Sequence, residues 1–370
     1  MNPKNRLGTK VVHAGLPKAA QGQAFAQSPV FASTFHLSGA ADSADYQYAR
    51  FSNPTWEQLE SSLRELESGE TIIFPSGMAA CSAVMSGLLN SGQTVVLPAD
   101  GYYATRAYAE AFLVPNGITL KLIKTAALID ADFTDVRLVL IETPSNPMLD
   151  VVDIQLLADK VHRTGGLLAI DNTTATVLGQ RPLLLGADIS ISADTKALNG
   201  HSDVLFGHVS TQEPAIAERV RLWRKLTGNI PGPMETWLVQ RGLATLDMRL
   251  ERMTTSAQIV AEFLAGHAKV AWVRYPGLSG DPSYAIAKHQ MDHFGFIVSF
   301  DLGSEASASK FLTHSSMIFE ATSFGGVHTM AERRARWGTD DVPEGFVRLS
   351  IGCEHIDDII ATLAESLDTI

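Results

Sequence analysis

Apolar side chains recur at two different periods through the middle of the chain. At Leu59, Leu63 and Leu66 they lie three and four residues apart, and Gly69 follows shortly after. Residues at this spacing share one face of a helix, and glycine commonly ends one. The stretch therefore predicts an amphipathic helix that stops at Gly69. The sequence also predicts helices at 78–92 and 154–165.

Between these helices lie short runs in which nearly every residue is apolar. A strand that is buried on both faces has this pattern, and such strands form parallel sheets covered by helices. The alternation of helix and strand over residues 57–240 therefore predicts an α/β layered domain with a mainly parallel sheet. The runs that predict strands are 94–99, 118–123, 136–142, 166–171, 189–192 and 204–210.

The pattern changes towards both ends of the chain. A long helical pattern at 243–267 precedes strand-like runs at 294–303 and 346–354, which predict a smaller α+β domain. The first fifty residues are polar and weakly periodic, so they predict an arm that lies over another surface. The expected organisation is an arm (1–50), a large domain (51–245) and a smaller C-terminal domain (246–370).

Composition restricts the possible partners. The 370 residues are 45% hydrophobic and 19% charged, which is ordinary for a folded protein. The net charge of −11 argues against nucleic acid or an anionic membrane as the main partner. The basic cluster "ERRARW" at 332–337 is therefore interpreted as a solvated loop or a subunit contact rather than an RNA site.

The cysteines and the opening residues indicate a compartment. "MNPKNRLGTK" has no apolar core of an export signal, and no apolar run reaches the length of a membrane helix. Cys81 and Cys353 form no C-x-x-C pair and have no metal-type spacing. We expect a cytoplasmic protein with a small-molecule substrate, no metal site and no membrane partner.

Polar residues follow the apolar runs that predict strands. Glu142 and Asn146 follow one run, Asp171 ends the next, and Thr195 and Lys196 follow a third. Ligands of open α/β sheets bind at the carboxyl ends of the strands. A carboxylate, an amide and a lysine are therefore expected to meet at one edge of the sheet.

Three interpretations of Asp171 are compared. It could cap the following turn, or it could bind Mg²⁺ in a nucleotide hydrolase, which needs a G-x-x-x-x-G-K-[ST] loop that is absent. It could also hold the nitrogen of a pyridine ring protonated, which fits a lysine further along. A dinucleotide site is disfavoured because no G-x-G-x-x-G follows a strand.

Pyridoxal phosphate (PLP) needs a lysine amine, an anion beside its ring nitrogen and donors for its phosphate. Lys196 and Asp171 supply the first two. The segment "PSGMAA" at 75–80 would open a helix, and free N–H groups at a helix start bind phosphate. This combination points to PLP chemistry.

Seven motifs in the same order resemble the PLP-dependent enzymes of cysteine and methionine metabolism. That family contains cystathionine γ-lyases, cystathionine γ-synthases, methionine γ-lyases and O-acylhomoserine sulfhydrylases. The resemblance implies the aspartate-aminotransferase-like fold (fold type I) and PLP as the cofactor. The motifs lie at 46–60, 76–80, 142–147, 171–176, 194–207, 323–329 and 347–354.

The resemblance assigns roles around the cofactor. Lys196 resembles the Schiff-base lysine that later acts as a general base. Asp171 would pair with the ring nitrogen, with Thr173 nearby. The phosphate would be held by Gly77, Met78 and Thr195, and by Tyr48 and Arg50 of a neighbouring subunit. The active unit would then be at least a dimer, and the family is usually a tetramer.

Further roles concern the substrate. Tyr102 corresponds to the tyrosine that stacks on the cofactor ring and can transfer a proton, with Tyr103 as the competing assignment. Arg348 resembles the arginine that binds the substrate α-carboxylate, with Asn146 and Ser323 alongside. A surface charge at the start of a strand is the alternative for Arg348.

Three positions depart from the family pattern. Ala193 replaces a serine that donates to the phosphate, which removes one hydrogen bond of about 1 kcal/mol. Thr322 replaces a glutamate that cystathionine-handling members place near the distal amino group of their substrate. Ala104 replaces the cysteine that follows the stacking tyrosine in methionine γ-lyases.

The expected reaction is a γ-elimination like that of cystathionine γ-lyases, giving 2-oxobutyrate, ammonia and a thiol. It is preferred because residues 323–337 resemble those of lyase-like members. The alternatives are γ-replacement, as in cystathionine γ-synthases and O-acylhomoserine sulfhydrylases, and methionine γ-lyase activity. A more distant alternative is a binding protein that has kept the fold without the chemistry.

Overall fold

The structure is a computed structural model and describes residues 5–370. Its larger sheet has seven strands in the order β1-β7-β6-β5-β4-β2-β3. Neighbours from β6 to β3 run parallel, whereas β7 is antiparallel to both β6 and β1. The strands are β1 (Glu70–Phe74), β2 (Thr94–Pro98), β3 (Thr119–Ile123), β4 (Val136–Glu142), β5 (Leu167–Asp171), β6 (Ile189–Ser192) and β7 (Gly207–Thr211).

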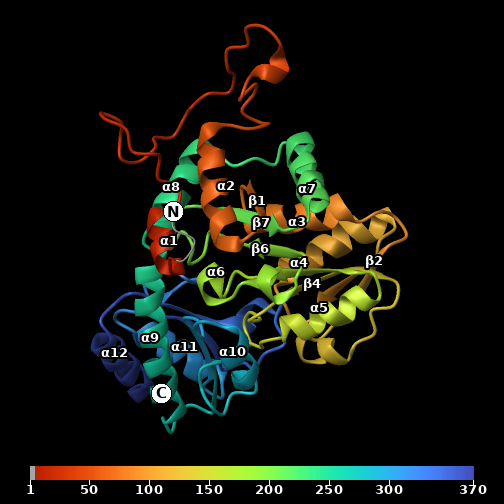
Figure 1. Cartoon of the computed structure of the whole chain (residues 1–370). Coiled ribbons are helices and arrows are strands. Elements are labelled where there is room, and N and C mark those ends of the chain that lie inside the picture. The colour runs from red at the N-terminus through yellow and green to blue at the C-terminus, as the bar shows by residue number, and fades with distance from the viewer. Residues whose placement is uncertain (1–4) are drawn as a thin grey trace.

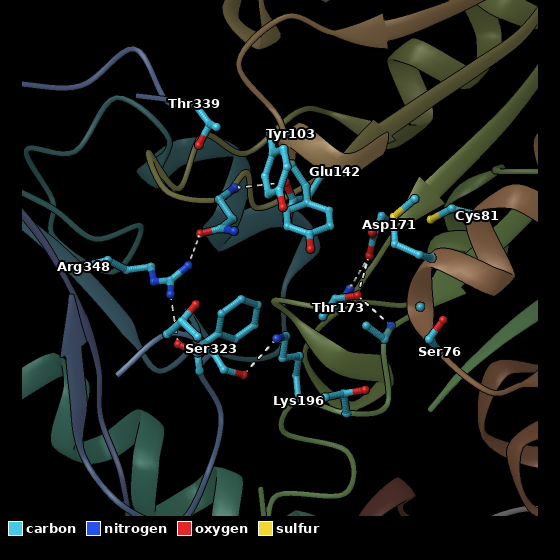
Figure 2. Close-up of a pocket in the computed structure, with 18 of the residues that line it drawn as sticks. Ser76, Cys81, Tyr103, Glu142, Asp171, Thr173, Lys196, Ser323, Thr339 and Arg348 are labelled. Carbon is cyan, nitrogen blue, oxygen red and sulfur yellow. Dashed lines mark hydrogen bonds between the residues drawn. The ribbon is translucent and has the colours of Figure 1, made fainter. Parts of the chain in front are cut away.

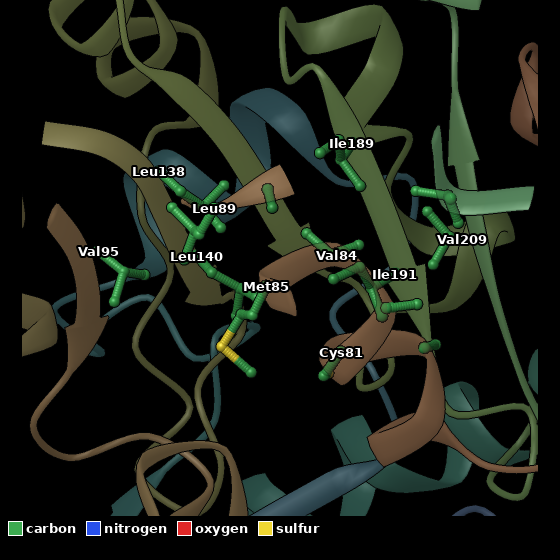
Figure 3. Packing of buried hydrophobic residues seen from close by; sticks show 14 of the residues in the cluster. Cys81, Val84, Met85, Leu89, Val95, Leu138, Leu140, Ile189, Ile191 and Val209 are labelled. Carbon is green, nitrogen blue, oxygen red and sulfur yellow. The ribbon is translucent and has the colours of Figure 1, made fainter. Parts of the chain in front are cut away.

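Helices cover both faces of this sheet (Figure 1). Alternate residues of β4 point to opposite sides: Leu138 and Leu140 pack with α3 and α7, while Val139 and Ile141 pack with α5. Figure 3 shows the first of these two clusters. The prediction of a mainly parallel α/β sheet is confirmed. The helices of this region are α2 (Pro54–Glu67), α3 (Gly77–Leu88), α4 (Tyr103–Tyr108), α5 (Ile154–Arg163), α6 (Thr176–Gly179), α7 (Pro214–Thr227) and α8 (Pro233–Leu243).

Three details of the sheet differ from the prediction. β1 is not among the predicted strands, because its short apolar run directly follows a helix and precedes a turn. The segment 204–210 contributes an antiparallel strand that begins only at Gly207. β3 is an edge strand with partly exposed residues on both faces, so its apolar sequence does not imply burial.

The smaller sheet follows the long helix α9 (Leu246–Ala265), which packs against it. Its strand order is β10-β11-β12-β9-β8, and all neighbours except β10 and β11 run antiparallel. The expected α+β region is therefore present. Its elements are β8 (Trp272–Arg274), α10 (Tyr284–Gln290), β9 (Ile297–Asp301), α11 (Glu305–His314), β10 (Phe319–Glu320), β11 (Met330–Arg333), β12 (Phe346–Ser350) and α12 (Ile356–Asp368).

Residues 5–50 include a helix packed on the body and a long projecting segment. α1 (Leu7–His13) lies against α2 and α9, and Val11 is buried there. The following stretch extends away from the body, as the orange-red ribbon at the top of Figure 1 shows. Phe25 and Phe31 on this segment are exposed. Contact with a neighbouring subunit, and the expected division at residues 50 and 245, stay predictions. No helix within residues 5–370 is both long and apolar enough to span a membrane.

Candidate active site

A cavity of about 430 Å³ lies at the carboxyl ends of β4, β5 and β6 (Figure 2). The register places Glu142 and Asp171 side by side at the ends of β4 and β5, and Lys196 follows β6. Residues of the C-terminal region close the other side. The predicted site residues that line the cavity are Gly77, Met78, Tyr102, Asn146, Asp171, Thr173, Thr195, Lys196, Ser323 and Arg348.

Lys196 lies in the turn after β6 with its amine inside the cavity. Nζ donates a hydrogen bond to Ser323 Oγ at 2.8 Å and lies 5.0 Å from the centre of the Phe324 ring. Burial and the nearby Arg348 cation outweigh the attraction of Asp171, so the pKa of Lys196 falls to about 8. This amine therefore loses its proton much closer to neutral pH than an ordinary lysine does, and its neutral form can act as a nucleophile or base.

Ser323 is held in an unusual backbone conformation. Its φ of 85° lies in the left-handed region, which residues other than glycine rarely adopt. The Ser323 hydroxyl accepts from Lys196, and its carbonyl accepts from Arg348 Nη2 at 2.9 Å. Such conformations persist where surrounding contacts enforce them, and they gather at functional sites.

Asp171 is oriented by Thr173. The Thr173 hydroxyl and backbone N–H both donate to Asp171 Oδ1, the latter at 3.1 Å. The same hydroxyl accepts from the backbone N–H of Ala193 at 2.8 Å, which ties Asp171 to the turn that carries Lys196. Burial raises the pKa of Asp171, while the bonds from Thr173 and the charge of Lys196 lower it. A cation beside this carboxylate would stabilise its ionised form.

The start of α3 forms a close-packed corner of the cavity. The Ser76 side chain caps α3 by accepting from the Ala79 N–H at 3.0 Å. A Cβ on Gly77 would lie 2.5 Å from the Ala193 Cβ, and one on Gly207 would lie 2.7 Å from the Ser76 carbonyl oxygen. Glycine at position 77 therefore lets the helix start approach the lysine turn, and glycine at position 207 lets it approach β7. The N–H groups at such a start are free to bind an anion.

Thr195 has a local partner already. Its hydroxyl donates to the Phe206 carbonyl at 3.1 Å and accepts from the Phe206 N–H at 2.8 Å. A hydroxyl has one hydrogen and two lone pairs, so a phosphate would have to compete for the hydrogen. This side chain therefore also fastens the lysine turn to the segment before β7.

Tyr102 and Tyr103 form an edge-to-face pair at the mouth, with ring centres 5.4 Å apart. Both line the cavity, and they are 40% and 45% exposed. Burial, then the neighbouring Tyr103, raises the pKa of Tyr102, so its hydroxyl stays protonated. The geometry leaves both tyrosines available as the stacking residue.

Arg348 projects from β12 into the cavity wall and is only 3% exposed, so the alternative of a surface charge is wrong. Nη1 donates to Asn146 Oδ1 at 2.8 Å, and Nη2 donates to the Ser323 carbonyl and to Glu332 Oε2. The three contacts fix the guanidinium beside the amine of Lys196.

The interpretation of 332–337 as a solvated loop is wrong for two of its residues. Glu332 and Arg334 are buried, because each is neutralised by oppositely charged partners. Arg334 and Trp337 also line the cavity. Their sequence pattern resembles that of a surface segment, and nothing in it identifies the partners that permit burial.

Tyr48 and Arg50 lie outside the cavity of their own chain. Arg50 Nη1 donates to the Lys225 carbonyl at 2.5 Å, and the guanidinium lies over the rings of Tyr48 and Phe51. Tyr48 is 40% exposed. The predicted role of these residues therefore depends on a second subunit.

The cavity brings together a lysine and a carboxylate at the strand ends of a parallel sheet, and both face the start of a helix. This arrangement defines the site of a PLP-dependent enzyme. The sequence pattern of the family described as "Cys/Met metabolism PLP-dependent enzyme" matches residues 8–368. This protein belongs to that family.

Relatives with different reactions resemble the chain. The putative cystathionine γ-lyase of Streptomyces coelicolor is 48% identical over 98% of this chain and 93% of its own length. The cystathionine γ-lyase of Bacillus subtilis is 35% identical over 98% of this chain and 99% of its own. A crystal structure of cystathionine γ-synthase from Xanthomonas oryzae pv. oryzae superposes with a TM-score of 0.94, at 33% identity, over 99% of this chain and 98% of that one.

The residues present fit PLP. Ser76, Gly77 and Met78 at the start of α3 line the cavity, so the free N–H groups of this helix start can bind the phosphate there. Lys196 and Asp171 line the same cavity, whose volume suits a cofactor with a small substrate. PLP is the cofactor of this family, and this cavity is where the chain offers the groups it needs.

Proposed function

We propose that this enzyme catalyses γ-elimination from a sulfur-containing amino acid, in the manner of a cystathionine γ-lyase. From cystathionine and water the products would be cysteine, ammonia and 2-oxobutyrate. The observation that carries the proposal is that Ser323 binds both groups. Its hydroxyl oxygen lies 2.8 Å from the Lys196 amine, and its carbonyl oxygen accepts from Arg348. A base in this position can reach the Cα proton of an amino acid whose carboxylate lies on Arg348.

We propose that Asp171, Gly77, Met78 and Thr195 hold the cofactor. PLP, when bound, supplies an electron-accepting ring that stabilises negative charge at Cα. Asp171, oriented by Thr173, would keep the ring nitrogen protonated. The backbone N–H groups of Gly77 and Met78 would bind the phosphate, with the hydroxyl of Thr195.

The substrate contacts follow from the other half of the cavity. Arg348 would bind the α-carboxylate through an N–H group that its protein partners leave free, and Asn146 holds the guanidinium in place. Lys196 would move protons at Cα and Cβ, since its pKa of about 8 lets it both accept and donate near neutral pH. Tyr102 would stack on the ring and donate to the leaving sulfur.

γ-Replacement is the second candidate, and one observation favours it. Thr322 lines the cavity and brings no charge for the distal ammonium of cystathionine. An O-acylhomoserine whose acyl group is replaced by sulfide has no distal ammonium, so this form of γ-replacement would need no such charge. The elimination and replacement reactions would use the same catalytic residues.

The test is release of 2-oxobutyrate from cystathionine, homocysteine, methionine and O-acylhomoserines, each with and without added cysteine. Elimination predicts keto acid from cystathionine or homocysteine that does not require a second thiol. Replacement predicts a thioether product from an O-acylhomoserine and cysteine. The Lys196→Ala variant is the control for keto acid release that does not depend on this lysine. Absence of keto acid from every substrate would refute the elimination proposal.

We also propose that the active unit is at least a dimer, most simply within a tetramer of two such dimers. In it, Tyr48 and Arg50 of one subunit would contact the phosphate bound by the next. The exposed side chain of Tyr48 and the projecting segment before it support this arrangement. The free cysteines Cys81 and Cys353 support a reducing, cytoplasmic location.

A hybrid experiment tests the shared site. The variants Arg50→Ala and Lys196→Ala are each expected to be inactive. Mixing them under conditions that exchange subunits should restore part of the activity, because some hybrid sites then contain neither substitution. If mixed subunits exchange and remain inactive, Arg50 acts within its own chain and the proposal fails. Light scattering on the native protein gives the oligomeric state directly.

A further inference from the structure

Glu332 occupies the centre of a buried polar cluster beside the cavity. It lies on β11 directly opposite Arg348 of β12 in the antiparallel register, and its exposed fraction is 0%. Its Oε2 accepts from Arg348 Nη2 at 3.0 Å and from Arg334 Nη1 at 2.8 Å. One carboxylate oxygen thus holds two guanidinium groups that would otherwise repel each other.

The other oxygen of Glu332 binds the segment at the mouth of the cavity. Oε1 accepts from Trp337 Nε1 at 2.6 Å and from Arg336 Nη2 at 3.3 Å. Trp337 and Arg334 line the cavity. The two oxygens of one side chain therefore connect the arginine at the inner wall to the residues of the outer wall.

The outer wall is also fastened to the large domain. Arg106, on the helix that follows Tyr102, donates from Nη2 to the Thr339 carbonyl at 3.1 Å. Asp340 accepts from Arg334 Nε at 2.8 Å. With these anchors in place, a change at Glu332 is expected to alter the orientation of Arg348 and Trp337 without releasing the whole segment.

We propose that Glu332 is a positioning residue for substrate recognition. It holds Arg348 in the orientation that binds the α-carboxylate, and it sets the outer wall that meets the γ-substituent. This inference rests on the proposed role of Arg348. In this role, one buried carboxylate determines both how the substrate α-carboxylate is bound and where the wall beside the substrate side chain lies.

The first test compares Glu332→Gln with Glu320→Gln. Glutamine keeps the shape but removes the charge that holds Arg348. We expect KM to rise about 10- to 100-fold, the range for losing a charged hydrogen bond, with kcat changed less than about threefold. Glu320 also binds Arg336, at 2.7 Å, but it is exposed, so Glu320→Gln should leave KM unchanged. Equal KM values for both variants would overturn the proposal.

A second test separates positioning from general loss of structure and needs no turnover. L-Alanine and ethylamine, which lacks the carboxylate, are titrated into the holoenzyme, and the cofactor absorption reports binding. Glu332→Gln should weaken the binding of alanine about 10-fold or more and leave that of ethylamine unchanged. Equal weakening of both ligands would contradict the role.

The two proposals can fail separately. If the native enzyme binds alanine but releases no keto acid, the proposed reaction fails while the role of Glu332 is still measured. If Glu332→Gln does not fold, Glu332→Asp retains the charge on a shorter side chain. Its loss of affinity should again be selective for alanine over ethylamine, and a non-selective loss would overturn the inference.

Discussion

Arg249 offers a demanding test of how the lysine turn is held. This residue of α9 is 7% exposed and donates from Nη1 to the Ala197 carbonyl at 2.6 Å and from Nη2 to the Leu198 carbonyl at 3.0 Å. It also donates to the Gly242 carbonyl and the Thr245 hydroxyl. Burial lowers the pKa of Arg249 to about 10, which leaves it charged at neutral pH. Ala197 and Leu198 directly follow Lys196.

The substitution Arg249→Met keeps much of the volume and removes every donor. The carbonyls of Ala197 and Leu198 would then lose their partner, whereas that of Gly242 keeps the Thr245 N–H. Each unsatisfied buried carbonyl costs about 1–3 kcal/mol. Removal of a buried charge offsets part of this loss. We therefore expect the free energy of unfolding to fall by about 2–4 kcal/mol.

The assay is urea unfolding of the holoenzyme, followed by circular dichroism and by the cofactor absorption. The cofactor signal should be lost at a lower urea concentration than the helical signal, because the lysine turn loosens first. Arg252→Met, an exposed position on the same helix, is the matched control and should match the native enzyme. If Arg249→Met loses both signals at the same urea concentrations as the native enzyme, Arg249 does not hold the turn.

Three further predictions concern single groups. Asp171→Asn should lower kcat by at least about 100-fold while PLP still binds, because a buried carboxylate that pairs with a cation contributes about 3–5 kcal/mol. Equal kcat values for the variant and the native enzyme would contradict this role. Capture of PLP by the apoenzyme should speed up as pH rises through about 8, since the neutral amine of Lys196 reacts and its pKa is lowered by burial. A midpoint near 10 would indicate an exposed lysine. His293 has a buried Nε2 without a partner, and burial lowers its pKa from 6.5 to about 4. As pH drops, the unfolded chain therefore takes up this proton at a higher pH than the folded protein does. The free energy of unfolding measured in urea should fall between about pH 6.5 and pH 4, and it should fall less in His293→Gln.

The inner half of the site could be predicted because it follows from local patterns. Asp171 and Lys196 each follow a short apolar run, and the carboxyl ends of parallel strands meet at one edge. The family motifs added the roles of residues such as Arg348, whose burial no local pattern indicates.

The outer half could not be predicted, because its residues depend on distant partners. Glu332 and Arg249 resemble solvated charges in sequence, yet their partners lie 16 positions away for Arg348 and 52 for Ala197. Burial of such a charge depends on the whole set of contacts around it. β3 differs from the prediction for a related reason, since its position at the sheet edge, and not its composition, sets its exposure.

The proposed chemistry depends on a covalent bond between Lys196 and the cofactor, and this bond can be located directly. The purified enzyme is reduced with borohydride, digested, and its peptides are examined by mass spectrometry. We expect a single pyridoxyl-phosphate addition on Lys196, and none in Lys196→Ala. An addition on another lysine, or an unmodified Lys196 in fully active enzyme, would contradict it.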